Sequence, residues 1–155
     1  MRQENKGICT GSDAINEELK EYCRRVIGKF KPICIILYGS RAKGTFTPSS
    51  DIDIIVLSDN FETDFLSRIK DLIDINSSTL PIEPLGYTKA EFETMLQSFK
   101  ITALDAIREG KPLFGEDYFN NLKKTLHEME KTGLYKGKTS WHLPSADTES
   151  GKALV

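Results

Sequence analysis

Two acidic residues one position apart, Asp51 and Asp53, are the first candidates for chemistry in this sequence. They open an apolar, β-branched segment, and alternate side chains of a strand share a face, so both carboxylates would lie on the same side of a sheet. Neighbouring carboxylates repel each other, and partial burial at a strand start adds to that cost. A divalent cation removes the conflict, because hard oxygen ligands bind magnesium, manganese or calcium. The pair therefore predicts a metal site.

Magnesium prefers one or two carboxylates and fills its remaining positions with water and substrate phosphate, so such a site would share a phosphate. Gly39 and Ser40 follow an apolar strand pattern and precede a short helix-compatible stretch. Glycine lets the backbone approach a ligand, the serine hydroxyl and N–H groups can bond phosphate oxygens, and a helix N-terminus favours an anion. Arg41 and Lys43 add positive charge beside this position.

Each of these features has an ordinary explanation when it stands alone. A Gly-Ser pair after a strand is commonly a turn, Asp-x-Asp at a strand start is commonly a solvated edge or cap, and two basic residues are commonly surface charges. The combination is less ordinary. Four specified residues at fixed spacing between two apolar strands should arise by chance in roughly one chain per thousand at average residue usage.

The surrounding sequence predicts the elements that position these residues. Apolar periodicity and cap residues indicate helices at roughly 12–30, 61–73, 88–110 and 117–131. Apolar runs indicate strands at 33–38 and 51–57, and the first of these, apolar throughout, is typical of a sheet centre. A third extended segment, 80–87, is expected at a sheet edge, because Pro81 and Pro84 lack the N–H that a central strand needs.

These elements predict an α+β fold with a small mixed β-sheet flanked by helices and a helical C-terminal extension. At 155 residues, 39% of them hydrophobic and 28% charged, the chain has the size of one compact domain. We expect a core over 12–95, helices over 88–135 packed on that core as part of the same domain, and a polar, flexible tail over 136–155.

Composition argues against several functional classes. A net charge of −2 gives no global attraction to nucleic acid, so a long nucleic acid is not an expected partner. No apolar run approaches the ~20 residues needed to span a bilayer, and the N-terminal segment lacks the apolar stretch of a signal peptide. The three cysteines have no metal-binding spacing and are expected to be reduced thiols. A cytoplasmic protein without a membrane role is expected, and a homo-oligomer stays open.

Gly39-Ser40, ten intervening residues and then Asp51-x-Asp53 resemble the signature of the polymerase-β-type nucleotidyltransferase superfamily. More narrowly, the segments 38–44 and 50–56 resemble the minimal, single-domain nucleotidyltransferases of bacteria and archaea, and the likeness covers about residues 12–95. The resemblance implies transfer of a nucleoside monophosphate, AMP from ATP in the leading case, to a hydroxyl with release of pyrophosphate.

The resemblance also implies which residues act. Gly39, Ser40 and Lys43 would contact the triphosphate, with Arg41 beside them, while the two aspartates and a third carboxylate would hold two magnesium ions, or manganese in their place. The family usually offers the third carboxylate on a short strand after the intervening helix, and Glu83 is the residue of this sequence at that place.

Glu83 has competitors and an ordinary explanation. Asp71 and Asp74 are nearer in sequence, but they lie on or at the end of the second predicted helix, whose solvated face explains them without function. Glu83 itself could be an edge-strand charge that discourages pairing between sheets.

The acceptor of the transferred group is the most open part of the interpretation. Minimal relatives modify a hydroxyl on a HEPN-type toxin partner, so the resemblance implies an antitoxin-type protein adenylyltransferase. Small-molecule nucleotidylation, as in antibiotic-modifying relatives, is the second enzyme hypothesis. A non-catalytic module that binds nucleotide or a partner protein is the hypothesis from another class.

Overall fold

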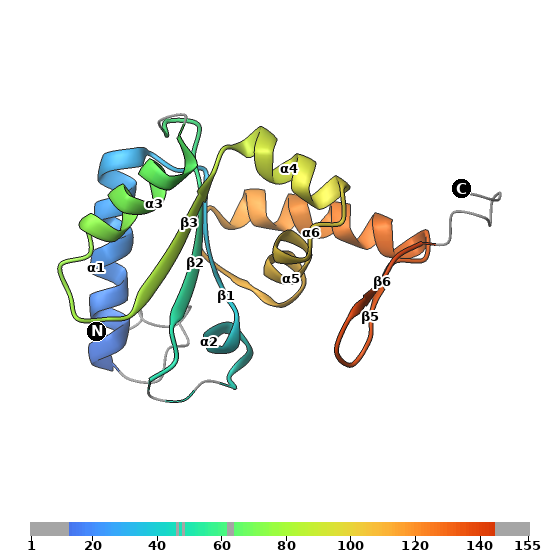
Figure 1. Cartoon of the computed structure of the whole chain (residues 1–155), viewed down its shortest axis with the longest axis horizontal. Coiled ribbons are helices and arrows are strands. Elements are labelled where there is room, and N and C mark those ends of the chain that lie inside the picture. Colours follow the sequence, from blue (N-terminus) through green and yellow to red (C-terminus); the bar gives the residue numbers. More distant parts are fainter. Residues whose placement is uncertain (1–12, 46, 48, 62–63, 145–155) are drawn as a thin grey trace.

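A four-stranded β-sheet with helices on both faces is the framework of the described part of the chain (Figure 1). The computed structural model describes residues 13–45, 47, 49–61 and 64–144, with side chains from residue 17 onward. The sheet contains β1 (Cys34–Tyr38), β2 (Ile52–Leu57), β3 (Ile82–Tyr87) and β4 (Lys111–Phe114). One face is covered by α1 (Asp13–Phe30) and α3 (Phe65–Asp74), and the other by α4 (Lys89–Gln97), α5 (Ile101–Glu109) and α6 (Glu116–Lys131). Within these residues, no helix is both long and apolar enough to cross a membrane.

The strand order is β3-β2-β1-β4, with β2 parallel to β3 and the other two pairs antiparallel. This mixed sheet flanked by helices confirms the predicted α+β class. The strand predicted at the centre, β1, has a neighbour on each side, and the proline-containing β3 lies at an edge as predicted. An edge strand tolerates Pro84 because its outer side needs no ladder donor.

Alternate residues of the two central strands enter two separate cores. On β1, Ile36 packs with α4, α5 and α6, whereas Ile35 packs with α1 and α3. On β2, Ile55 and Ile54 divide in the same way, and all four side chains are fully buried. Burial on both faces explains why these strands are apolar without alternation.

The helix predicted over 88–110 is wrong as a single element, because α4 and α5 are separate. Phe99 adopts a left-handed conformation (φ 61°), and the N–H of Lys100 donates to the Met95 carbonyl at 2.9 Å, which ends α4. Both helices bury apolar residues in the same core, so the periodic pattern continues across the break. A pattern of buried positions alone therefore could not reveal the change of direction.

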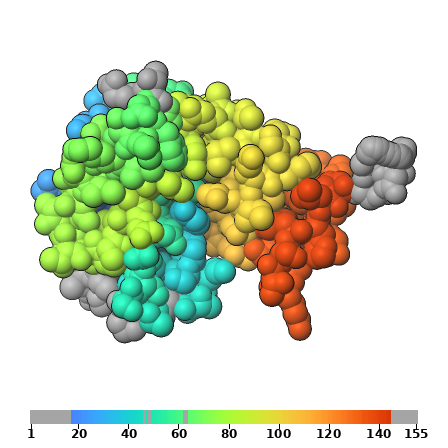
Figure 2. Space-filling model, viewed as in Figure 1, coloured from blue at the N-terminus to red at the C-terminus, as the bar shows by residue number. Residues whose placement is uncertain are grey.

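Three short strands were not predicted from the sequence. Residues 111–114 form β4 against β1, with an irregularity in the register between Ile35 and Ile36. Residues 135–142 contain a hairpin, β5 (Tyr135–Lys136) with β6 (Trp141–His142), where the sequence predicted a polar tail. It projects from the body of the domain (Figures 1 and 2). Residues 145–155 of the predicted tail lie outside the described residues.

The hairpin is anchored by a carboxylate of α5. Trp141 donates from Nε1 to Asp105 Oδ1 at 2.7 Å, and Lys136 Nζ lies 2.6 Å from the same oxygen. The Lys136 ammonium also lies over the Trp141 ring, 5.4 Å from its centroid. A single side chain of α5 therefore holds both strands of the hairpin, through partners that the sequence pattern could not pair in advance.

Asp105→Ala should release the hairpin while leaving the sheet intact. Because Trp141 is the only tryptophan of the chain, its fluorescence reports this segment alone. We expect a red-shifted emission maximum and a decrease of about 1.5–3 kcal/mol in the free energy of unfolding, the value of one hydrogen bond to a charged group. Glu128→Ala, which removes an exposed carboxylate paired with Lys131 on α6, should leave the emission unchanged. An unshifted spectrum in Asp105→Ala would contradict the anchoring role.

Candidate active site

The register of the sheet brings Tyr38, Asp53 and Glu83 into one row. Tyr38 lies opposite Asp53 in the antiparallel β1–β2 pair, and Asp53 lies beside Glu83 in the parallel β2–β3 pair. In-register side chains of adjacent strands share a face, with strands about 4.8 Å apart. Asp51 directly precedes β2, one residue before Ile52. The parallel pairing thus places Glu83 beside the two aspartates, as the sequence analysis expects, and its role as a metal ligand stays a prediction.

The three carboxylates affect one another electrostatically. The charge of Asp51 and a hydrogen bond to the Asp51 side chain raise the pKa of Glu83, with smaller contributions from desolvation and from Asp53. Partial burial raises the pKa of Asp53, and the charge of Asp51 raises it further. An acid whose pKa is raised in the folded state favours a neutralising proton or cation. The cluster therefore carries a charge conflict of the kind that the sequence predicted for the aspartates alone.

Tyr38 is a site residue that the sequence analysis quoted only as part of a motif. Burial, then the charge of Asp53, raises the pKa of Tyr38 to about 12, so its hydroxyl stays protonated beside the carboxylates. The signal for its place in the site is the strand pairing of Tyr38 with Asp53, which depends on a register that the sequence does not state. A cavity of about 430 Å³ adjoins this row and is lined by Tyr38, Asp53, Ile69, Ile73, Ile82, Glu83, Pro84 and Leu85.

Gly39 follows β1 and brings the backbone against the Asp53 carboxylate. Its φ is 78°, a left-handed conformation, and a Cβ at this position would overlap Asp53 Oδ2. No other residue type satisfies both conditions without displacing the carboxylate. Ser40 then begins α2 (Ser40–Lys43), a single turn in which the Gly39 carbonyl accepts the N–H groups of Ala42 and Lys43, each at 3.1 Å.

The two basic residues of α2 differ in position. Arg41 is buried and donates from Nη2 to the Ser50 carbonyl at 3.1 Å, which ties α2 to the segment entering Asp51. Lys43 is exposed, and its Nζ lies 3.7 Å from Glu109 Oε1 at the end of α5. The geometry therefore gives Arg41 a positioning contact within the fold and leaves Lys43 at the surface beside the Gly39–Ser40 turn.

The donor set fits a magnesium site only in part. In the described segments, no three acidic, histidine or cysteine side chains are arranged as a complete metal-ligand set. The Asp51, Asp53 and Glu83 oxygens are nonetheless hard donors in mutual repulsion, and magnesium keeps several waters and substrate phosphates in its shell. The chemistry of these residues therefore suits a metal whose remaining ligands come with the substrate.

The alternative third ligands lie on α3. Asp74 pairs with Lys70 at 2.8 Å, an exposed i,i+4 ion pair that accounts for it without a metal. Asp71 occupies the preceding turn of the same helix, whose Leu72 faces the core with α1.

Comparison with known proteins gives the chain a family. A model described as "Nucleotidyltransferase domain" matches residues 16–109. No curated protein matches the chain at a significant level.

One similar solved structure is a Sulfolobus solfataricus protein assigned as a nucleotidyltransferase, with 21% sequence identity; the match covers 54% of this chain and 81% of that chain, with a TM-score of 0.41. A toxin–antitoxin structure with AMP-PNP has 21% identity; the match covers 74% of this chain and 90% of that chain, with a TM-score of 0.43. A mutant of the toxin–antitoxin pair MntA-HpeT has 21% identity; the match covers 74% of this chain and 89% of that chain, with a TM-score of 0.42.

The repulsion among these carboxylates predicts that Glu83→Gln makes the metal-free protein more stable, by an amount that depends on pH. Because the folded state raises the pKa of Glu83, its carboxyl group stabilises the fold below the unfolded pKa of about 4.3, and this contribution is lost as pH rises through the folded pKa. The variant should therefore melt at a higher temperature than wild type near pH 7.5 with EDTA, and the gain should vanish near pH 4. Glu128→Gln on α6 should show no such gain, and a destabilised Glu83→Gln at pH 7.5 would contradict the repulsion.

Gly39 and Gly44 form a matched pair for testing the close approach to Asp53. Both have a positive φ, 78° and 79°, but a Cβ on Gly44 would meet no atom within 4 Å. Gly44→Ala should lower the free energy of unfolding by about 1–2 kcal/mol, because alanine is strained at a positive φ, and should keep its activity. Gly39→Ala should lose more stability and should also lose nucleotidyl transfer, as measured by melting and by pyrophosphate release. If the two substitutions lowered stability and activity equally, the close approach of Gly39 to Asp53 would not be the cause.

Proposed function

The chain belongs to the nucleotidyltransferase domain family, and we propose that it joins the α-phosphate of ATP to an acceptor hydroxyl at the Asp53 row. The acceptor oxygen forms a bond to the α-phosphorus, the bond from that phosphorus to the bridging oxygen breaks, and pyrophosphate leaves. The acceptor proton passes to solvent or to a neighbouring base. The observation that carries the proposal is the meeting of Asp53 with Gly39 on one side and Glu83 on the other.

Each residue of the site has a distinct task in this proposal. Gly39 and Ser40 bind phosphate oxygens with backbone N–H groups and the serine hydroxyl, because the missing Cβ lets the chain come close. Lys43 belongs to the same helical turn as Ser40, and its ammonium would exchange the Glu109 carboxylate for a phosphate oxygen. Arg41 positions the strand entry through Ser50.

The three carboxylates bind the cations. Asp51, Asp53 and Glu83 would hold two magnesium ions, or manganese, which supply Lewis-acid stabilisation of the phosphate charge and lower the pKa of the acceptor hydroxyl. Tyr38 keeps its hydroxyl protonated beside Asp53 and can donate a hydrogen bond into the cavity at this row.

The acceptor in this proposal is a hydroxyl on a partner protein in the cytoplasm. The resemblance to minimal nucleotidyltransferases supports an antitoxin-type adenylyltransferase with a HEPN-type partner. The cavity beside the carboxylates adds support, since five of its eight lining residues are aliphatic or proline and suit an acceptor with an apolar body. Transfer to a small, polar acceptor is the second candidate, favoured only by the same family membership.

Magnesium and ATP should stabilise the protein together, and substitution of the carboxylates should separate binding from chemistry. A ligand that binds the folded state raises the free energy of unfolding by about 2.7 kcal/mol at a hundredfold excess over Kd, so the melting shift with magnesium and ATP together should be clear.

Asp51→Asn and Asp53→Asn should each abolish pyrophosphate release with the fold retained. Glu83→Gln should lower turnover by orders of magnitude while the ATP-dependent shift largely persists, because the Gly39–Ser40 turn still binds the phosphates.

Asp74→Asn is the matched control, since it removes a carboxylate of α3 that already has a lysine partner. Its turnover should stay within a few-fold of wild type. Turnover lost in Asp74→Asn but kept in Glu83→Gln would move the third ligand to α3. Equal melting temperatures with and without magnesium-ATP would favour a non-catalytic module.

A further inference from the structure

A chain of ion pairs connects α2 with the β5–β6 hairpin. Lys43 Nζ lies 3.7 Å from Glu109 Oε1, and Lys136 Nζ lies 4.0 Å from the other oxygen of the same carboxylate. The Lys136 ammonium also lies 2.6 Å from Asp105 Oδ1, the oxygen that accepts the Trp141 N–H. Positive and negative charges therefore alternate from α2, through α5, to the only tryptophan of the chain. We call Lys43, Glu109 and Lys136 the Glu109 bridge.

The fold fixes the end of α5 beside the phosphate-binding turn. Gly110, which follows α5, packs so closely on β1 that a Cβ there would lie 2.9 Å from the Leu37 carbonyl oxygen. The next residue, Lys111, pairs with Leu37 in the sheet. Gly39 is only two residues beyond Leu37, so Glu109 at the end of α5 stays next to the turn. Figure 1 shows α5 between α2 and the hairpin.

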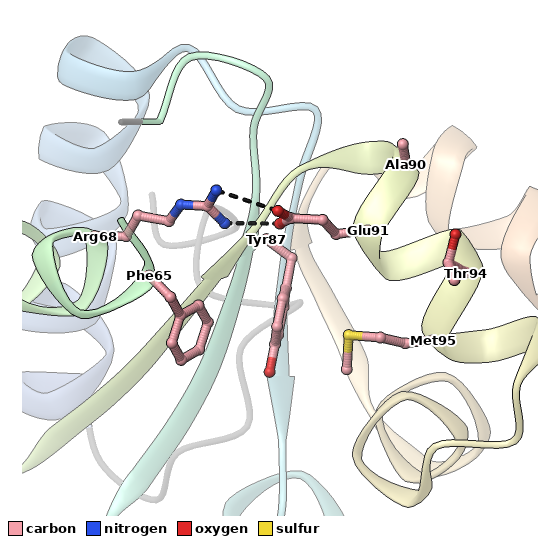
Figure 3. Close-up of a pocket in the computed structure, with 7 residues that line it drawn as sticks. All are labelled: Phe65, Arg68, Tyr87, Ala90, Glu91, Thr94 and Met95. Atoms are coloured by element: carbon pink, nitrogen blue, oxygen red, sulfur yellow. Dashed lines mark hydrogen bonds and ion pairs between the residues drawn. The ribbon is translucent and has the colours of Figure 1, made fainter. Parts of the chain in front are cut away.

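Glu109 is held more loosely than Glu91, a carboxylate of α4 that bridges to α3. Both oxygens of Glu91 accept hydrogen bonds from the Arg68 guanidinium, at 2.7 and 3.2 Å (Figure 3). The two Glu109 distances, 3.7 and 4.0 Å, are longer than a hydrogen bond, and its oxygens lie near different lysines. Glu109 can therefore shift toward one lysine at little cost, whereas Glu91 is committed to a single partner.

Asp105 and Glu109 depend on these lysines because the two carboxylates repel each other. They are four residues apart on α5, so they lie on the same side of the helix, where like charges destabilise it. Lys43 and Lys136 offset the two negative charges. A triphosphate that takes Lys43 leaves Lys136 as the cation of the bridge, between two carboxylates. The exchange then costs less free energy with Lys136 present than without it.

We propose that Glu109 sets the affinity of the turn for the triphosphate, and that Lys136 acts on nucleotide binding through Glu109. This inference rests on the proposed nucleotidyl transfer, in which Lys43 exchanges Glu109 for a phosphate oxygen. Glu109 competes with ATP for Lys43, and Lys136 weakens that competition by pairing with Glu109 once Lys43 has left. Both are positioning residues, since they act through Lys43. Because coupling is reciprocal, ATP draws Lys136 toward Glu109 and changes the surroundings of Trp141.

Two substitutions and their combination test the bridge by calorimetric titration of the full chain with ATP and magnesium. Glu109→Gln should bind ATP about twofold to fivefold more tightly than wild type, the range expected for one exposed ion pair. Lys136→Met should bind ATP more weakly by a similar factor, whereas Lys136→Arg, which keeps the charge, should bind it as wild type does. In the Glu109→Gln background, Lys136→Met should have no effect, because the carboxylate through which it acts is gone.

Glu130→Gln is the matched control. The Glu130 side chain is 21% exposed and pairs with Arg108, 46% exposed, while the Glu109 side chain is 28% exposed and pairs with Lys43, also 46% exposed. Glu130 joins α6 to α5 as Glu109 joins α5 to α2. Its partner Arg108 has no part in binding the triphosphate in this proposal, so Glu130→Gln should leave the ATP affinity unchanged.

The fluorescence of Trp141 gives a second measurement, which also decides the case in which Lys136→Met does not fold. Saturating magnesium-ATP should change the emission of wild type and of Glu130→Gln. It should leave the emission of Glu109→Gln and Lys43→Met unchanged, because neither variant can pass the exchange at Lys43 on to Lys136.

The outcomes separate this inference from the proposed function. An ATP affinity of Lys136→Met that equals wild type, or that falls equally in both backgrounds, would overturn the bridge. So would equal ATP affinities of Glu109→Gln and Glu130→Gln, or a Trp141 emission that does not change in a wild-type protein that binds magnesium-ATP. A wild-type protein that does not bind magnesium-ATP would instead overturn the proposed transfer, and this inference with it.

Discussion

Three carboxylates that repel one another lie together in this structure, and the buried strands beneath them must hold them in place. Burial and the charge of Asp51 raise the pKa of Asp53, and the charge of Asp51 raises the pKa of Glu83, so a fold without function would gain by separating these carboxylates. They stay together because the strands beneath them are fixed by burial on both faces. Ile54 and Ile55 of β2, which follow Asp53 in the chain, are fully buried in different cores. Moving the carboxylates apart would expose apolar surface that stabilises the domain far more than the local repulsion destabilises it.

The mixed topology of the sheet completes the site from three distant segments. An antiparallel neighbour, β1, ends at Tyr38 and turns at Gly39 beside Asp53. A parallel neighbour, β3, begins at the same end of β2 and so brings Glu83 to the same row. Had β3 run antiparallel, its first residues would lie at the far end of β2, with Tyr87 near Asp53. The direction of one edge strand therefore decides whether the third carboxylate belongs to the cluster.

Local chemistry in the sequence was enough to predict part of this arrangement. The Gly39–Ser40 turn and the Asp51-x-Asp53 pair follow from residue type and spacing, because alternation along a strand is a local property. Glu83 required the family resemblance, since its place depends on strand pairing. Arg41 could not be distinguished from a surface charge, because arginine is rarely fully buried and the carbonyl that accepts its hydrogen bond belongs to a loop.

The break at Phe99 explains both the failed helix prediction and the open carboxylate row. A single helix over 88–110 would be about 34 Å long, whereas the six-residue β3 spans about 20 Å, so half of the apolar stripe would extend past the sheet. The change of direction at Phe99 keeps that stripe against the same core. Helices α4 and α5 then cover the row that contains Ile36 and Ile55, both fully buried, and the next row, with Tyr38, Asp53 and Glu83, stays partly or fully exposed. Access to the site is thus a consequence of how two short helices fit a small sheet.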